Sequence, residues 1–122
     1  MSNRSALIGA IVFAWLPEKG ASSQPGPKYR PVYILDVCDG RAKVAYGTSK
    51  RTTEIHRGEF VVKTDEHAGL AKDTKFSLVN QCWLPLDERY FTRNGKLNSL
   101  GRLVPEIAQR VVLALTEIGE ID

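Results

Sequence analysis

The sequence contains few residues of the kinds that build metal sites and covalent cross-links. Its 122 residues include two cysteines, two histidines and one methionine. Cys38 and Cys82 lie inside apolar runs, which favours buried free thiols in a reducing compartment over a disulfide. His56 and His67 stand alone in polar segments, where we interpret them as solvated, and no Cys/His spacing matches a zinc site. The sequence therefore gives no reason to expect a metal or another cofactor.

Long apolar runs are also missing. No segment reaches the roughly 18 apolar residues that a membrane-spanning helix needs. The N-terminus lacks the apolar run and small-residue cleavage site of a secretory signal peptide. We therefore expect a cytoplasmic protein with no membrane association. A length of 122 residues and a hydrophobic content of 43% suit a single compact domain over residues 1–122.

The net charge of +3 is small, but the charges are unevenly distributed. Acidic residues concentrate at 65–66, at 87–88 and near the C-terminus. Basic residues gather in the first half, around a predicted loop and the nearby strand ends: Lys28, Arg30, Lys43, Lys50, Arg51 and Arg57. A solvated face explains any one of them, whereas the cluster as a whole indicates an anionic partner.

Apolar, β-branched runs separated by polar segments predict strands over most of the chain. The predicted strands cover 8–16, 31–38, 41–47, 60–62 and 75–84. A loop over 17–29 contains three prolines and two glycines, and loops of that length in compact domains are often functional. Asp39-Gly40 predicts a tight hairpin, and Asn94-Gly95 predicts a turn.

Helical spacing of apolar residues is found only near the end of the chain, at Ile107, Val111, Leu115 and Ile118. Pro105 suits the first helical position and Gly119 suits the C-terminal cap. We therefore expect a helix over 104–118. Many short strands followed by one late helix predict a mainly β fold, with a bent antiparallel sheet or barrel and a C-terminal α-helix.

The segment Tyr29-Arg30-Pro31-Val32 lies where the predicted loop meets the second strand. Proline lacks a backbone donor and is tolerated at the first residue of a strand, so we expect Arg30 at the rim of the sheet. An arginine fixed there can hold a phosphate through two parallel hydrogen bonds. The alternative is a rim arginine paired with an acidic neighbour.

Four features follow one another in an order that resembles the MazF/PemK family, the toxin components of type II toxin–antitoxin systems. They are an apolar strand opening with Gly9, a Gly-x-x-x-Gln-x-Gly loop over 20–26, the Arg30-Pro31-Val32 segment, and a strand that ends in Thr48-Ser49. The resemblance covers nearly the whole chain. It implies an SH3-like barrel with attached helices, a homodimer, and inhibition by an acidic antitoxin protein.

The resemblance also implies a metal-independent endoribonuclease that cuts single-stranded RNA, such as mRNA, at short sequence motifs. In the implied reaction the ribose 2'-hydroxyl attacks the adjacent phosphate, leaving a 2',3'-cyclic phosphate and a 5'-hydroxyl. Arg30 matches the family's active-site arginine, and Thr48 matches its threonine at the end of the third strand. Both are therefore candidate catalytic residues, although a threonine at that position can also simply cap a turn.

Further candidates for substrate binding flank these two residues. Gln24 matches the glutamine of the family's first loop, and Tyr29 offers a ring on which a base can stack. Basic residues next to Arg30 and Thr48 can follow an RNA backbone. The predicted substrate-binding residues are Gln24, Lys28, Tyr29, Ser49, Lys50, Arg51, Gln81 and Trp83.

The sequence departs from the family pattern at three places. Ser23 precedes Gln24 where many relatives have a glutamate, so a proton acceptor is missing unless Glu18 replaces it. Trp83 stands where relatives have a basic residue, and its ring either packs in the core or stacks on a base. Asn80 stands where some relatives have an acidic residue. These departures leave open a module that binds RNA, or a topoisomerase-type protein, without cutting RNA. A structural or regulatory barrel with no nucleic-acid role is a third alternative.

Overall fold

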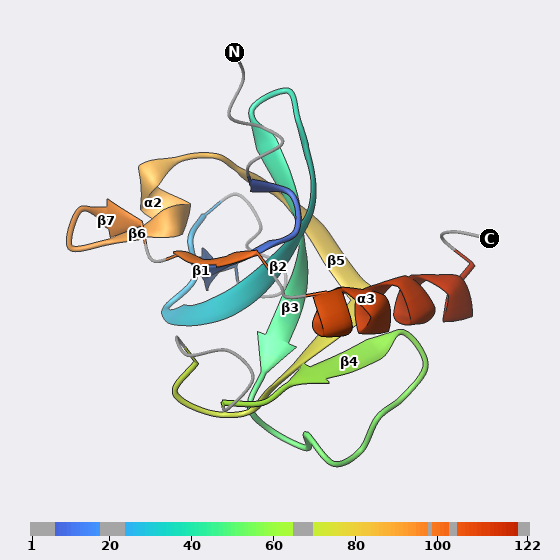
Figure 1. Cartoon of the computed structure of the whole chain (residues 1–122). Helices are drawn as coiled ribbons and strands as arrows, with labels where there is room; N and C mark the ends of the chain where they lie inside the picture. The colour runs from blue at the N-terminus through green and yellow to red at the C-terminus, as the bar shows by residue number, and fades with distance from the viewer. Residues whose placement is uncertain (1–6, 18–23, 65–69, 98, 103–104, 120–122) are drawn as a thin grey trace.

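The computed structural model describes residues 7–17, 24–64, 70–97, 99–102 and 105–119. The described part is mainly β, as predicted, and ends in a helix (Figure 1). In chain order its elements are β1 (Ala10–Leu16), β2 (Lys28–Cys38), β3 (Arg41–Thr48), β4 (Glu59–Val62), β5 (Thr74–Pro85), α2 (Glu88–Phe91), β6 (Thr92–Arg93), β7 (Lys96–Leu97), β8 (Ser99–Arg102) and α3 (Pro105–Glu117). Within these ranges, no helix is long and apolar enough to cross a membrane.

Six of the strands form one antiparallel sheet in the order β4-β5-β3-β2-β1-β8. The predicted bent antiparallel sheet and C-terminal helix are thereby confirmed, and Figure 1 shows the long strands curving and α3 lying beside β4 and β5. Among the described strands, β4 and β8 are the two edges of the sheet. Closure into a barrel stays a prediction.

Two apolar clusters cover the two faces of this sheet. The first is built mainly from β1, β2 and β3, with Tyr90 and Phe91 of α2 packed against it. The second joins β4 and β5 to Ile107, Val111 and Ala114 of α3. Successive side chains of β5 point to opposite faces of the sheet. Phe76 belongs to the second cluster, whereas its two neighbours on the strand point to the other face.

The second strand begins earlier than predicted. Residues 28 and 29, assigned to the loop from sequence, and Arg30, expected at the rim of the sheet, are the first three residues of β2, where Arg30 is paired with Ala14. Pro31 is therefore the fourth strand residue and is paired with Phe13. The hydrogen-bonded pairing of β2 with β3 begins only at Val32 and Tyr46. Pro31 has no backbone N–H to donate, and it is tolerated because it lies just before this pairing begins.

The late part of the chain contains one element that the sequence pattern did not predict. Helix was expected only at the end, but Glu88–Phe91 form the short helix α2, with the Asp87 side chain accepting from the Arg89 N–H at 2.8 Å. A helix of four residues is too short to show helical periodicity. The helix predicted over 104–118 is observed as α3 over Pro105–Glu117, and residue 104 lies outside the described residues.

A large bulge interrupts the pairing of β3 with β5. Ala45 is paired with Gln81, but the next residue, Tyr46, is paired with Ser77, so residues 78–80 are left over on β5. The Gln81 side-chain amide closes this bulge by donating to the Leu78 carbonyl. Bulges redirect side chains near functional sites, and this one turns Asn80 toward the cavity described below.

The cysteines are free, as predicted, but they are not both buried. Cys38 ends β2 at the hairpin and is exposed, because the apolar run around it finishes one residue before the turn. Cys82 is partly buried, and its thiol lies 3.2 Å from the Tyr46 hydroxyl. Burial and the contact with Cys82 raise the pKa of Tyr46 far above its ordinary value, so its hydroxyl stays protonated and neutral.

Candidate functional site

A cavity of about 520 Å³ lies where β2, β3, β4 and β5 meet the loops that follow β1 and β3. We call it the basic cavity, because five of its lining side chains are cationic and one is anionic. It is lined by Leu16, Pro17, Pro27, Lys28, Arg30, Tyr46, Gly47, Thr48, Lys50, Arg51, Glu59, Lys75, Ser77 and Asn80. Both candidate catalytic residues, Arg30 and Thr48, are among them.

The strand register explains why these side chains share one face of the sheet. Thr48 of β3 is paired with Lys75 of β5, and opposite residues of antiparallel strands point to the same side. Val32 of β2 is paired with Tyr46 of β3 in an antiparallel register. Two residues further along in the same direction, Arg30 of β2 therefore lies beside Thr48 of β3. A guanidinium, a hydroxyl and an ammonium thus line up across three neighbouring strands.

Arg30 is available to bind a ligand. Its side chain is half-buried and forms no hydrogen bond or ion pair with any other described residue. The alternative of an arginine paired with an acidic neighbour is therefore not observed within the described part. A guanidinium held by a strand and lacking a protein partner is suited to a two-pronged contact with a phosphate.

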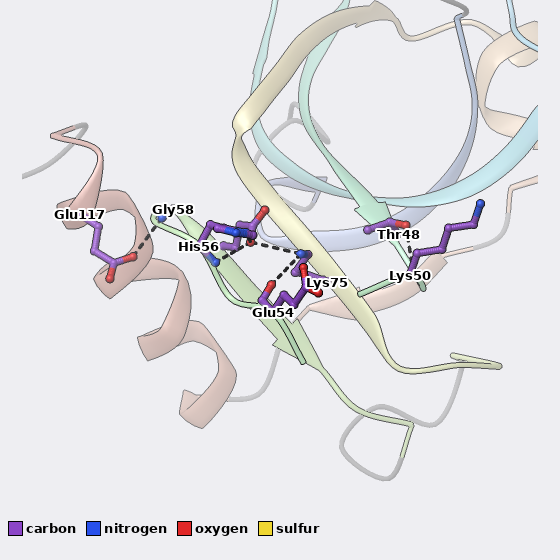
Figure 2. Close-up of polar contacts among 8 residues, drawn as sticks. Thr48, Lys50, Glu54, His56, Gly58, Lys75 and Glu117 are labelled. Carbon is purple, nitrogen blue, oxygen red and sulfur yellow. Dashed lines mark hydrogen bonds and ion pairs between the residues drawn. The ribbon is translucent and has the colours of Figure 1, made fainter. Parts of the chain in front are cut away.

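Thr48 caps a turn and also lines the basic cavity. Its Oγ1 accepts a hydrogen bond of 3.2 Å from the Lys50 N–H (Figure 2). A hydroxyl has one donor proton in addition to its acceptor lone pairs. The capping contact uses only a lone pair, so the Thr48 O–H remains able to donate to a phosphate oxygen.

The basic residues next to Arg30 and Thr48 are spread along the rim of the cavity. Lys28, Lys50 and Arg51 line it and are exposed. Arg51 adopts a left-handed backbone with φ of 54°, and its carbonyl accepts from the Glu54 N–H at 3.1 Å. Exposed cations around a hollow attract an anion at long range, and salt screens that attraction.

A second cavity, of about 430 Å³, lies beside the first and shares Lys28, Arg30 and Gly47 with it. It contains two further predicted residues, Tyr29 and Ser49. The Tyr29 ring is already surrounded: its centroid lies 4.8 Å from that of Trp15 and 5.5 Å from that of Phe13, and Arg93 lies over it at 5.7 Å. This packing leaves little of the ring open to a base.

Three of the predicted substrate-binding residues line neither cavity. Gln24 is exposed in the loop before β2, and the Gln81 side chain is used in the β5 bulge. Trp83 is paired with Lys43 and is 42% exposed, which excludes the core alternative. Lys43 precedes Thr48 by five residues, so Trp83 lies roughly 16 Å along the sheet from Thr48.

The site includes three residues that sequence reasoning missed, namely Glu59, Lys75 and Ser77. Lys75 Nζ lies 3.3 Å from Glu59 Oε1 and donates to the Glu54 carbonyl at 2.8 Å, and its side chain is only 7% exposed (Figure 2). Ser77 Oγ is buried and has no hydrogen-bond partner among the residues that the structure describes. The polar residues 75 and 77 alternate with Phe76 and Leu78 in β5, and that alternation was a usable signal.

His56 is exposed, as expected, but it does not stand free of the site. Its backbone N–H donates to Glu59 Oε1 at 2.7 Å, and its ring Nδ1 lies 3.1 Å from the same oxygen. The loop residues that the sequence offered as proton acceptors or loop markers, Glu18, Gly20 and Ser23, lie outside the described residues, as does His67.

Two glycines are required by close approaches around the site. A Cβ at Gly26 would lie 1.6 Å from the Leu16 carbonyl oxygen, so only glycine lets the first loop pass against the end of β1. A Cβ at Gly47 would lie 2.7 Å from the Pro31 carbonyl oxygen and 2.8 Å from the Phe76 ring. Gly47 thereby allows the close approach of β3 to the Pro31 backbone, next to Thr48 and Arg30.

Among the described residues, no cluster of three or more His, Cys, Asp or Glu side chains could hold a metal ion. The chain matches no protein-family model, and no curated protein is significantly similar to it.

Proposed function

We propose that the protein is a toxin-type endoribonuclease that cleaves single-stranded RNA without a metal ion. The observation that carries this proposal is the convergence of Arg30 and Thr48, which are 18 residues apart in sequence, on one basic cavity. A guanidinium and a hydroxyl are groups that can bind one phosphate together. The other three cations at the cavity rim suit an RNA backbone.

The proposed reaction is an in-line attack of the ribose 2'-hydroxyl on the adjacent phosphate. Fixed positive charge stabilises the crowded phosphorane, and Arg30 supplies it through two N–H groups. The Thr48 hydroxyl donates to a non-bridging oxygen of the same phosphate. The products are a 2',3'-cyclic phosphate and a 5'-hydroxyl, and cations built into the protein replace a metal.

The biological setting is part of the same proposal. We infer an SH3-like barrel of the MazF/PemK type, a cytoplasmic homodimer, and an acidic antitoxin whose disordered tail competes with RNA for the basic cavity. The charge of the cavity rim supports an acidic inhibitor. Light scattering of the purified protein would test the dimer, and co-purification with the product of a neighbouring small gene would test the antitoxin.

The deciding experiment incubates the protein with a long mixed-sequence RNA in EDTA and maps the new ends. We expect discrete cuts with 5'-hydroxyl ends, and their loss in Arg30→Ala and in Thr48→Ala. Thr48→Ser keeps the hydroxyl and is the matched control that should retain cleavage. Full activity in both alanine variants would exclude this site.

A second candidate is a module that binds RNA or a topoisomerase-type protein without cutting RNA. The observation that favours it is the position of Gln81 and Trp83 outside the cavity, together with the serine at position 23. Intact RNA at every protein concentration, with salt-sensitive RNA binding, would support the RNA-binding form. Intact RNA and no RNA binding would direct attention to a protein target.

A further inference from the structure

Glu59, the first residue of β4, is the one carboxylate among the described residues that line the basic cavity. It is paired with Ser77, and Ser77 is paired in turn with Tyr46. Opposite residues share a face, so the Glu59 side chain belongs to the same face as Arg30 and Thr48. The side chain is 12% exposed.

The two carboxylate oxygens of Glu59 differ in their contacts. Oε1 is the acceptor for the His56 N–H at 2.7 Å, and it also lies 3.1 Å from the His56 ring Nδ1 and 3.3 Å from Lys75 Nζ. Oε2 accepts from no group in the described part of the chain. One oxygen therefore fixes the carboxylate, and the other is available to a ligand.

The surroundings keep Glu59 ionised. Burial by itself raises its pKa, but the hydrogen bond from the His56 N–H, the ammonium of Lys75 and the His56 ring together lower the pKa below its ordinary value. A carboxylate in this state is an acceptor throughout the neutral range. Lys75 also has a third N–H beyond its contacts with Glu54 and Glu59.

We propose that Glu59 is the general base of the cavity and takes the proton from the attacking ribose 2'-hydroxyl through Oε2, with Lys75 and His56 as positioning residues. This inference rests on the proposed ribonuclease function. It supplies the proton acceptor that the serine at position 23 removes from the first loop.

The proposed step transfers two protons and exchanges one bond to phosphorus for another. The 2'-oxygen loses its proton to Glu59 Oε2 and forms the bond to phosphorus. The bond from phosphorus to the 5'-oxygen breaks, and that oxygen takes a proton from water. Arg30 remains a cation throughout, and exchange with solvent removes the proton from Glu59.

The neighbouring acids are poorer candidates. The Glu54 side chain is exposed and lines none of the cavities at the site, and only its backbone carbonyl contacts Lys75. Glu117 of α3 lies on the far side of the β4 loop, where its carboxylate accepts from the Gly58 N–H at 3.0 Å (Figure 2). Among the described acidic residues, only Glu59 both lines the basic cavity and has a carboxylate oxygen without a hydrogen-bond partner.

Most charged groups that face Glu59 are cationic. On its own loop it faces His56, and on β5 it faces Lys75. Across the basic cavity lie Lys28, Arg30, Tyr46, Lys50 and Arg51. On the side of α3, another cavity of about 770 Å³ that Glu59 also borders adds Lys63, Arg110 and Glu117. This excess of positive charge favours an ionised Glu59 and an anionic substrate.

The test compares Glu59→Gln with Glu54→Gln, which removes the same charge five residues away. We expect single-turnover cleavage to fall by about 10²- to 10⁴-fold in Glu59→Gln, the usual contribution of a general base. Glu54→Gln should cleave like the wild type. Both variants should bind a non-cleavable 2'-O-methyl RNA within about twofold of the wild type, because the phosphate-binding residues remain.

The pH profile separates a base from a merely structural group. In the wild type, protonation of Glu59 removes the acceptor, so cleavage should fall only below about pH 4.3, the ordinary glutamate pKa. This acid limb should be missing in the residual activity of Glu59→Gln. Added formate should partly restore cleavage in Glu59→Ala. If Glu59→Gln does not fold, Glu59→Asp keeps the charge beside Lys75 and should cleave about tenfold or more slowly with unchanged binding.

The outcomes distinguish this inference from the proposed function. Suppose that the wild type cleaves RNA, that cleavage needs Arg30, and that Glu59→Gln has the same rate and pH profile as the wild type. This result would overturn the role of Glu59 and leave the proposed ribonuclease function in place. Wild-type protein that leaves RNA intact overturns both. If the Glu59 variants lose both cleavage and RNA binding, and formate does not restore cleavage in Glu59→Ala, Glu59 has a structural role only.

Discussion

At the scale of single residues, the guanidinium of Arg30 is the group whose shape matters most. The Arg30 side chain is half-buried in β2 and forms no hydrogen bond or ion pair with the described residues. An ammonium has the same charge but cannot make two parallel hydrogen bonds to one phosphate.

Arg30→Lys should therefore retain RNA binding within a few-fold and lose about 100-fold or more in single-turnover cleavage, measured with a short fluorescent RNA. Arg41→Lys, at an exposed position of β3 outside both cavities, is the matched control. Equal activity of Arg30→Lys and the wild type would mean that only the charge of Arg30 is used.

Lys75 and Glu59 form an ion pair whose stability depends on pH. The pKa of Glu59 is lowered in the folded protein, so its contribution to the free energy of unfolding is present above about pH 4.3 and lost as the pH falls below it. Lys75→Met leaves a largely buried carboxylate without its cation.

We expect Lys75→Met to lower the free energy of unfolding at pH 7 by about 3 kcal/mol, measured by urea titration. The loss should shrink as the pH falls through the lowered pKa of Glu59 and the carboxylate takes up a proton, and the double variant with Glu59→Gln should recover part of it. Additive effects of the two substitutions would show that the pair contributes no coupling energy.

At the scale of elements, the approach of β2 to β3 depends on Gly47. A methyl group there would contact the Pro31 carbonyl oxygen and the Phe76 ring at well under van der Waals distance. Both neighbours belong to paired strands and have little room to move.

Gly47→Ala should thus lower the free energy of unfolding by about 1–3 kcal/mol, as overpacking usually does. It should also reduce cleavage, because separating β2 from β3 separates Arg30 from Thr48. Ser49→Ala, at an exposed position just past β3, should leave thermal stability unchanged. A Gly47→Ala melting curve that coincides with that of the wild type would contradict this account.

Another contact between elements joins α3 to the loop that carries Glu59. The Arg57 side chain donates to the Glu117 carbonyl at the end of α3, and the Gly58 N–H donates to the Glu117 carboxylate at 3.0 Å. Arg110 of α3 donates to the Val61 carbonyl at 2.9 Å. The helix therefore supports β4 at both ends and holds Glu59 near Lys75.

At the scale of the whole molecule, the distribution of charge matters more than the net charge of +3. Four exposed or half-buried cations around the basic cavity, Lys28, Arg30, Lys50 and Arg51, can each displace one counterion from RNA.

The logarithm of the RNA association constant should fall with the logarithm of salt concentration at a slope of about −3, which is about 0.7 per cation for a single strand. Lys50→Gln should reduce the slope by about 0.7, whereas Lys96→Gln in β7, outside the cavity, should not change it. Fluorescence anisotropy between 50 and 300 mM salt measures both, and a slope near zero would argue against any nucleic-acid role.

The sequence by itself determined the fold class, and it offered Arg30 and Thr48 as candidate site residues, which the fold brings to one cavity. Strand periodicity, the late amphipathic spacing and the turn pairs Asp39-Gly40 and Asn94-Gly95 are local properties, and they predicted the sheet, the helix and the turns. Short-range patterns missed α2, which has a single turn, and placed the start of β2 too late at Pro31.

Only the tertiary structure decided which side chains meet. The alternation within β5 indicates that Lys75 and Ser77 share a face, but no local pattern links that face or Glu59 to Arg30. Strand register brings these residues together across β2, β3, β5 and β4. The β5 bulge shifts this register, and the Gln81 side chain donates to the Leu78 carbonyl within the bulge instead of lining the cavity. Trp83 is paired with Lys43 and lies on a distant part of the sheet. Pairing between strands is a long-range property, so the composition of the site became visible only in the folded chain.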